Sequence, residues 1–318
     1  MKTGKLSQSI FERSVLKEFH REQIEDYKGA GNICAFLPVS CETENFSLLH
    51  ESVAAMTVYM AANKLIAKGS RPTAAVVNLI LTTRQSEAFL KKVIRSTSDA
   101  LAAYGMCLAG CRVEVIDAVA APVATVTVLG QPVDEAYHNR TIQPGQDVVM
   151  SKCLGLGATA VLSCVKEEEI LSRYSRHLFE QAKAMNNSLS VAPEAATAMK
   201  SSVSGMCHVN KGGVFGALWE MADQAGVGLI IDLKKIPVRQ ETIEISEIYD
   251  INPYEMLGCG SLLMVAEDGY DLARQLKNEG IMAEVIGKTT DNNDRVIMND
   301  GENRFLEPAK PDELLKVL

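Results

Sequence analysis

The chain has 318 residues, of which 47% are hydrophobic and 23% are charged, a globular composition that excludes disorder as the main state. Its 40 acidic against 32 basic residues give a formal net charge of −8, which disfavours nonspecific binding to nucleic acid or to anionic membranes. The N-terminal sequence does not have the pattern of a signal peptide, and no apolar run suits a membrane helix. We therefore expect a cytoplasmic protein whose eight dispersed cysteines stay reduced.

The first part of the chain predicts an α/β domain over residues 1–140, with some antiparallel strand pairing. The apolar spacing from Ser52 predicts a helix that ends at Gly69, and segment 86–104 predicts an amphipathic helix that ends at Gly105. Strands are expected at 33–39, 74–81, 112–119 and 123–129.

The segment 131–145 is rich in turn formers and is expected to lead into a second α/β domain, residues 141–318. Apolar runs predict strands in this domain at 147–151, 158–164, 227–233, 261–266 and 283–288. Helical spacing predicts helices at 167–185, 213–226, 240–249 and 268–280. Two α/β domains in tandem are therefore the predicted fold class.

A pair of glycines in the second domain is the most informative local feature. Gly212 and Gly213 come directly before a predicted helix, where free N–H groups and a partial positive charge can receive an anion. Lys211 and His208, just upstream, would add positive charge. The residues alone favour a simpler interpretation, a strand-to-helix turn in which glycine supplies conformational freedom.

The other local signals are weaker. Gly260 and Ser261 lie at the start of a predicted strand and could place backbone amides against a ligand, but they form no known nucleotide motif. Cys107 and Cys111 have the spacing C-x₃-C, and no second pair or histidine follows at zinc-site spacing. Most of the cysteines are therefore expected to be small buried hydrophobic residues.

Five segments carry a resemblance to a known family. They are MKTGKL, NKLIAKGSRP, VATVTVLG, the run from GGVFGALWEMADQAGVG to CGSLLMV, and the tail MAEVIGKTT…RFLEP…DELLKVL. Together they resemble the aminoimidazole ribonucleotide (AIR) synthase superfamily of PurM, thiamine-monophosphate kinase and selenophosphate synthetase, and most of all its branch of HypE-like hydrogenase maturation factors. The resemblance implies a two-domain PurM-like α/β fold, an N-terminal domain that dimerises through its sheet, and ATP bound between the domains. Members typically phosphorylate an amide or acyl oxygen.

The resemblance also implies which positions form the site. Those that match the family pattern are Asn63, Glu114, Gly212, Gly213, Gly260 and Ser261. Those that differ from it are Lys64, where the family usually has Asp, together with Arg112, His208 and Lys211. Lys5 could reach the cleft if the N-terminal arm folds over it. Only Glu42 or Glu44 could serve as the acidic residue that the family carries shortly after its first strand.

These changes lead to two hypotheses about function. In the first, Lys64, Arg112, His208 and Lys211 form a basic pocket that binds an anionic ligand, such as ATP, with little or no need for Mg²⁺ and no metal ligands. Lys211 and His208 are then the candidate catalytic residues of an ATP-dependent, phosphoryl-transferring enzyme. In the second, the chain is a catalytically degenerate paralogue that acts as a dimeric scaffold or accessory binding protein.

The expected partners are a small nucleotide or phosphate ligand, a second copy of the chain, and a further protein, but neither nucleic acid nor membrane. A weaker third hypothesis brings Cys111, Cys207 and Cys259 together as a thiol or soft-metal site.

Overall fold

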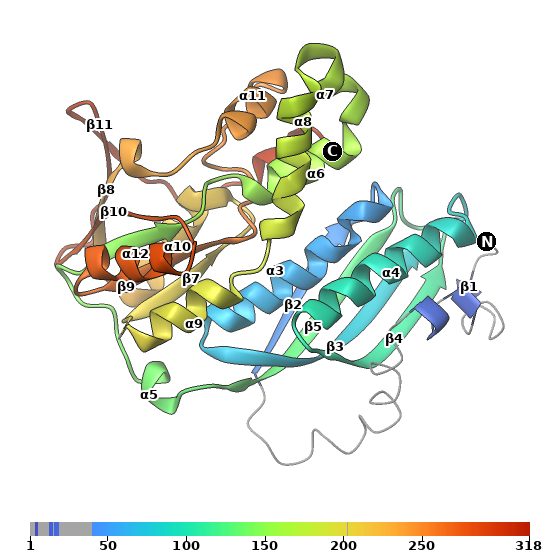
Figure 1. Ribbon diagram of the computed structural model, residues 1–318, viewed down its shortest axis with the longest axis horizontal. Coiled ribbons are helices and arrows are strands. Elements are labelled where there is room, and N and C mark those ends of the chain that lie inside the picture. Colours follow the sequence, from blue (N-terminus) through green and yellow to red (C-terminus); the bar gives the residue numbers. More distant parts are fainter. Residues whose placement is uncertain (1–3, 6–12, 15, 19–39, 202) are drawn as a thin grey trace. The chain divides into compact units, whose positions relative to one another are not determined.

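The computed structural model describes residues 4–5, 13–14, 16–18, 40–201 and 203–318, and these form two compact units (Figure 1). Unit 1 comprises the described residues of Met1–Leu65 together with Ser70–Val133. Unit 2 comprises Ile66–Gly69 and Asp134–Leu318. The strand expected at 33–39 lies outside the described residues.

The described strands of unit 1 form one sheet in the order β1-β4-β3-β5-β2. Their bounds are β1 (Gly4–Lys5), β2 (Ser40–Ser47), β3 (Ser70–Leu81), β4 (Cys107–Val115) and β5 (Val123–Pro132). Strands β3 and β4 pair in parallel, and every other described pair of this sheet is antiparallel. The mixed pairing agrees with the expected α/β domain with antiparallel neighbours.

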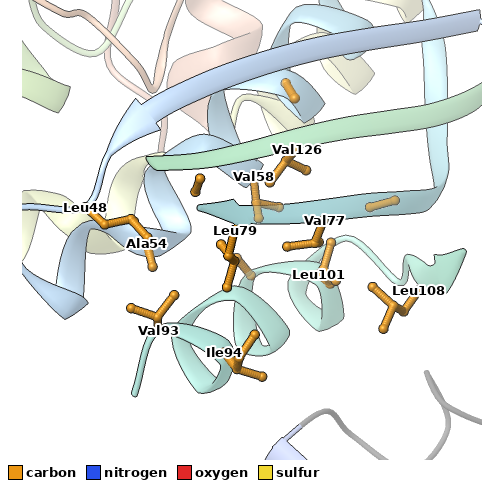
Figure 2. Packing of buried hydrophobic residues seen from close by; sticks show 14 of the residues in the cluster. Leu48, Ala54, Val58, Val77, Leu79, Val93, Ile94, Leu101, Leu108 and Val126 are labelled. Carbon is orange, nitrogen blue, oxygen red and sulfur yellow. The ribbon is translucent and has the colours of Figure 1, made fainter. Parts of the chain in front are cut away.

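Two helices, α3 (Ala54–Ala67) and α4 (Glu87–Ala103), cover one face of this sheet (Figure 1). Local signals define both ends of α4: the Ser86 side chain accepts a bond from the N–H of Phe89, and Gly105 follows at φ +65°. Between these helices and the sheet, apolar side chains such as Val58 of α3, Val77 of β3 and Ile94 of α4 form the core of the unit (Figure 2). Helices α3 and α4 were therefore predicted correctly.

The other face of the sheet carries no described helix, and strand register shows which side chains it holds. Val126 pairs with Glu44 on one side and with Val77 on the other, so all three face the helices. The next row, with Asn78 beside Arg112, points to the opposite face. We call this second side of the sheet the open face.

The described strands of unit 2 form a second sheet in the order β12-β11-β8-β10-β6-β9-β7. Their bounds are β6 (Asp147–Ser151), β7 (Gly205–Val209), β8 (Gly228–Asp232), β9 (Ser261–Ala266), β10 (Ala283–Thr290), β11 (Arg295–Asn299) and β12 (Glu302–Phe305). Of the described pairs in this sheet, only β8 and β11 are parallel.

Helices cover both faces of the second sheet around the inner strand β6, which is buried along its whole length. Val148 and Met150 join the core beneath α10 (Gly213–Ala225). Val149 faces α12 (Gly269–Asn278), since a Cβ on Gly269 would lie 2.9 Å from its Cγ2. The remaining helices are α5 (Glu135–His138), α6 (Leu156–Val165), α7 (Glu167–Arg173), α8 (Arg176–Ala184), α9 (Ala192–Lys200) and α11 (Gln240–Ile248).

Two predictions in unit 2 are wrong. The apolar run 158–164 is not a strand but part of α6, whose residues Leu156–Ser163 are buried, so the helix has no polar face to reveal its period. The segment 167–185 is two helices rather than one, because Ser175 is extended and caps α8 by accepting a bond from the N–H of Leu178.

Other differences concern strands, and also helices α5 and α9, which were not predicted. The polar segment β2 was not predicted as a strand, and β4 begins at Cys107 rather than at residue 112. Strands β7, β11 and β12 were also missing from the prediction. Within the described residues, no helix is long and apolar enough to cross a membrane.

Candidate functional site

In unit 1, the altered residue Lys64 contacts the two acidic residues of β2. Its Nζ lies 3.3 Å from Glu42 Oε2 and 3.8 Å from Glu44 Oε1. Both glutamates face the helices and are nearly buried, at 9% and 8% exposure. Buried carboxylates are costly without a balancing charge, and the Lys64 ammonium supplies one. The family position that usually holds Asp therefore holds a cation bound by two carboxylates.

Asn63, the neighbouring family position, is fully buried at the packing of α3 against α4. Its Oδ1 accepts a hydrogen bond of 2.7 Å from the hydroxyl of Tyr104, the residue that ends α4. The Tyr104 ring also packs edge-on against Tyr59, with ring centres 5.7 Å apart. The observed contact of Asn63 is therefore a structural one that joins the two helices.

Arg112 and Glu114 lie on the open face of the sheet and form an ion pair of 3.0 Å. The backbone of Lys5 in β1 pairs with Glu114 at the sheet edge. Because side chains alternate along a strand, Arg112 projects from one face of the sheet while Glu42 and Glu44, which hold Lys64, project from the other. Within unit 1, Arg112 and Lys64 therefore do not converge on one pocket as we had expected.

In unit 2, His208 lies on the edge strand β7 and is 6% exposed. Its neighbour Cys207 faces α10, with Sγ 3.7 Å from the carbonyl oxygen of Ala217, so His208 faces the other side of the sheet. Lys211, after the strand, is exposed. The two residues that we proposed as catalytic are thus a buried strand residue and an exposed loop residue.

The two glycine segments of unit 2 lie beside each other. Val209 at the end of β7 pairs with Ser261 at the start of β9. Just beyond this pair, the N–H of Gly258 donates to the carbonyl of Asn210 at 3.1 Å. The structure therefore joins the segments that the sequence offered as separate candidates.

Three N–H groups at the start of α10 are engaged within the protein. Gly212 N–H donates to the carboxylate of Asp312 at 2.8 Å, and Gly213 N–H donates to the Asn210 carbonyl at 3.1 Å. Phe215 N–H donates to the Tyr254 carbonyl at 3.2 Å. An anion that bound Gly212 would therefore have to displace Asp312.

Asp312 is the residue of this region that sequence reasoning missed. Its carboxylate also accepts hydrogen bonds from the N–H groups of Leu257, at 3.1 Å, and Leu314, at 2.9 Å. Burial raises the pKa of Asp312, while the three N–H donors and Lys211 act in the opposite direction. The only sequence signal is local, an Asp that caps the 3₁₀ turn Glu313–Lys316, and it says nothing about Gly212.

Gly260 and Ser261 also have internal partners. The Ser261 hydroxyl donates to the carbonyl of Cys153 at 2.6 Å and is fully buried. The carbonyl of Gly260 accepts from Lys152 Nζ at 2.9 Å. Gly260 has φ +106°, and a Cβ there would lie 2.8 Å from the Ser188 carbonyl oxygen. These two residues therefore shape the segment before β9.

The described cysteines are free thiols without a metal-binding arrangement. Within the described ranges, no group of three or more His, Cys, Asp or Glu side chains could hold a metal ion. Burial raises the pKa of Cys111 to about 12, so its thiol is not ionised near neutral pH. Cys259 is fully buried, and Cys207 packs toward α10. These environments are those of small core residues.

A cavity of about 400 Å³ lies beside α10 in unit 2. Its walls include the stacked rings of Phe215 and Tyr254, whose centres are 5.0 Å apart. Its lysine, Lys310, is paired with Glu307 at 2.5 Å, so this ammonium does not add an uncompensated positive charge. The cavity thus has the size of a small-molecule site.

The described chain thus consists of two α/β units, with a pair of glycines at the start of α10 in the second. Sequence models of the AIR synthase related protein family match residues 36–131 with the N-terminal domain and 143–299 with the C-terminal domain. The chain therefore belongs to the AIR synthase related family.

Relatives of the chain within this family include HypE proteins. Carbamoyl dehydratase HypE of Rhodobacter capsulatus is 24% identical over 234 residues, which cover 71% of this chain and 66% of that protein. A putative hydrogenase expression/formation protein of Methanocaldococcus jannaschii is 24% identical over 249 residues, which cover 76% of this chain and 72% of that protein. The chain is thus HypE-like in sequence.

Solved structures agree on the fold. E. coli HypE superposes with a TM-score of 0.79 at 15% identity, over 98% of this chain and all of that one. HypE in complex with ATP superposes with a TM-score of 0.78 at 16% identity, over 98% of this chain and 96% of that one. The structure of a HypE–HypF complex superposes with a TM-score of 0.68 at 18% identity, over 89% of this chain and 95% of that one. The two-domain PurM-like fold that we predicted is confirmed.

Proposed function

We propose that the chain binds ATP or a related nucleotide, and that the Lys64 ammonium stands where a divalent cation would otherwise lie between Glu42 and Glu44. The contacts of 3.3 and 3.8 Å carry this proposal. The Lys64 side chain is 45% exposed, and an ammonium has three N–H donors. It can therefore contact two carboxylates and still donate to a phosphate oxygen.

The comparisons support nucleotide binding in general terms, because HypE in complex with ATP shares the fold. As candidates for phosphate contacts we keep Lys64 and Lys211, which are both cations with exposed side chains. His208 remains our candidate for a catalytic role with Lys211. The acceptor would be an amide or acyl oxygen, as the family resemblance implies.

The residues present do not fit a magnesium ion. Mg²⁺ needs oxygen ligands in near-octahedral geometry, usually including one or two carboxylates. The carboxylates of Glu42 and Glu44 already bind the Lys64 ammonium, so a metal ion could reach them only by displacing it. We therefore propose nucleotide binding that does not depend on Mg²⁺.

Isothermal titration with ATP and ADP, in Mg²⁺ or in EDTA, tests this proposal. We expect binding in both conditions with Kd values within about threefold of each other, since no metal mediates the contact. Lys64→Ala should weaken binding by roughly tenfold or more, because one charge-assisted hydrogen bond to the phosphate is lost and the positive charge beside Glu42 and Glu44 is removed.

The matched control is Lys91→Ala. Lys91 in α4 has a similar exposure of 40% and pairs with Glu87 on the surface, so its loss should leave ATP affinity unchanged. No heat with wild-type protein in either condition would remove the proposal.

An accessory role is the second candidate, favoured by the engagement of both β2 carboxylates by Lys64. Phosphoryl transfer usually relies on metal ions to neutralise developing charge. ATP turnover that Lys211→Ala abolishes would contradict the accessory role, and binding without turnover would support it. The HypE–HypF complex supports a protein partner for such a role.

We also propose a homodimer formed through the open face of unit 1. This face holds half-buried side chains such as Val76, Ile80 and Leu129, and Thr43 and Thr127 join across it by a bond of 2.8 Å. We expect light scattering to give twice the mass of the chain, and Val76→Lys to give the monomer. A monomeric wild-type protein would contradict this arrangement.

A further inference from the structure

Lys152 has an unusual environment for a lysine. It follows strand β6 with φ +53°, a backbone conformation that residues other than glycine rarely adopt. Its side chain is only 19% exposed. A strained backbone under a mostly buried ammonium indicates that its surroundings hold this residue in place.

Four oxygen atoms surround the Lys152 Nζ. The carbonyl oxygens of Ser188, Ser190 and Gly260 lie at 3.0, 2.6 and 2.9 Å. The fourth oxygen is Glu194 Oε1, at 2.6 Å. The three N–H bonds of an ammonium thus match the three carbonyls, while the carboxylate balances its charge.

Glu194 depends on this one cation. It is fully buried in the first turn of α9, and neither carboxylate oxygen has a hydrogen-bond partner within the part of the chain that the structure describes. The ion pair with Lys152 is therefore its electrostatic compensation. Three carbonyl oxygens and a carboxylate oxygen around one positive charge are also the ligands that K⁺, or the acceptors that NH₄⁺, would take from a protein.

The oxygens come from chain segments that are far apart in sequence. Ser188 and Ser190 precede α9, and Gly260 precedes β9. The next residue, Ser261, donates to the carbonyl of Cys153, directly after Lys152. The Lys152 ammonium therefore ties the segment before β9 to the end of β6 and to the start of α9.

We infer that Lys152 is a positioning residue whose ammonium acts as a built-in monovalent cation, filling an oxygen cage that fixes Gly260 and Ser261. The cage itself is independent of the proposed function. Its consequence for nucleotide binding rests on the proposed function, since Gly260 and Ser261 belong to the family's site pattern.

Thermal unfolding of Lys152→Ala in chloride salts of K⁺, NH₄⁺ or tetramethylammonium, at equal ionic strength, tests the cage. In tetramethylammonium, which is too large to enter, we expect Tm to fall by roughly 5–10 °C, because Glu194 is left buried and unbalanced. K⁺ or NH₄⁺ should restore at least half of this loss. Wild-type Tm should be the same in the three salts.

Two control variants separate the cage from a general loss of charge. Lys152→Met fills the space without a charge and should lose stability in all three salts alike. Lys288→Ala also removes the partner of a buried carboxylate, Asp147, but the Lys288 ammonium is 65% exposed, so bulk water replaces it without regard to cation size. A Lys152→Ala protein that melts like wild type, or equally in all salts, overturns the inference.

If Lys152→Ala does not fold, Lys152→Arg decides the question by hydrogen exchange. A planar guanidinium cannot place its N–H groups on the same four oxygens, so exchange at the amides of 258–262 should quicken at least tenfold over wild type. Unchanged exchange overturns the inference. In the folded Lys152→Ala protein, ATP affinity should also be higher in K⁺ than in tetramethylammonium. If wild type binds no ATP, the proposed function fails while the melting experiment still decides on the cage.

Discussion

Gly213→Ala is expected to lower the stability of unit 2 by about 3–5 kcal/mol, which corresponds to a fall in Tm on the order of 10 °C. Gly213 has φ +65°, where an alanine is strained. A Cβ there would lie 2.3 Å from the Tyr254 carbonyl oxygen and 2.9 Å from the Glu255 carbonyl carbon. These are backbone atoms, and the bond from Phe215 N–H to that carbonyl prevents their withdrawal.

The matched control stands at the other end of the same helix. Gly226 follows α10 with φ +66°, and a Cβ there would meet nothing within 4 Å. Gly226→Ala should therefore cost only the backbone strain, about 1 kcal/mol. Fluorescence of Trp219, the sole tryptophan and itself in α10, reports unfolding of this unit. Equal Tm values for the two variants would show that the approach of Tyr254 does not require glycine.

The same experiment distinguishes the two interpretations of the glycine pair. If the role of Gly213 is to let a ligand approach the backbone, Gly213→Ala would weaken ligand binding and leave Tm nearly unchanged. If it serves the packing of Tyr254, as the contacts indicate, Tm falls in the absence of any ligand. The structure thus favours the simpler of the two sequence interpretations at this position.

Lys64→Asp is expected to create a divalent-cation site where wild type has none. The substitution replaces the ammonium beside Glu42 and Glu44 by a third carboxylate, and clustered carboxylates are ligands that Mg²⁺ and Mn²⁺ prefer. Titration with Mn²⁺ should give a Kd below roughly 1 mM for the variant, that is, a binding free energy beyond about −4 kcal/mol. Wild type should give no measurable binding.

Stability and nucleotide binding supply two further readouts for Lys64→Asp. Without metal, mutual repulsion of three carboxylates should lower Tm, and Mn²⁺ should restore it by mass action. ATP binding should then require the metal. Lys64→Asn, which removes the charge without adding a carboxylate, is the control and should not bind Mn²⁺. A folded Lys64→Asp protein that does not bind Mn²⁺ would contradict our proposal that the Lys64 ammonium occupies the place of a divalent cation.

Much of the fold could be predicted because local signals agree with it. Strands β6 and β9 lie where apolar runs placed them, and α4 occupies the segment 86–104 that was predicted as a helix ending at Gly105. Prediction failed where burial removed the signal. Helix α6 is apolar around its circumference, so its sequence shows no helical period. Strand β2 lacks the apolar alternation of a typical strand, because two of its buried positions are glutamates paired with Lys64 of α3.

The candidate site was harder to predict, because motif positions do not show what a side chain contacts. Asn63 matched the family pattern, but it bonds Tyr104 from α4. Ser261 also matched, but its hydroxyl bonds the Cys153 carbonyl. Arg112 and Lys64 are both positively charged, but strand alternation and helix packing place them on opposite sides of the unit 1 sheet.

The sequence by itself determined the family, the two α/β units and the order of most elements, because these follow from local periodicity, capping residues and motif similarity. Only the tertiary structure decided which charges meet. Lys64 contacts residues of β2, Lys152 contacts Glu194, and Asp312 bonds an amide 100 residues away. Such contacts depend on how distant segments pack. A carboxylate in the unfolded chain is solvated by water, and it needs a charged or hydrogen-bonding partner only once folding has buried it.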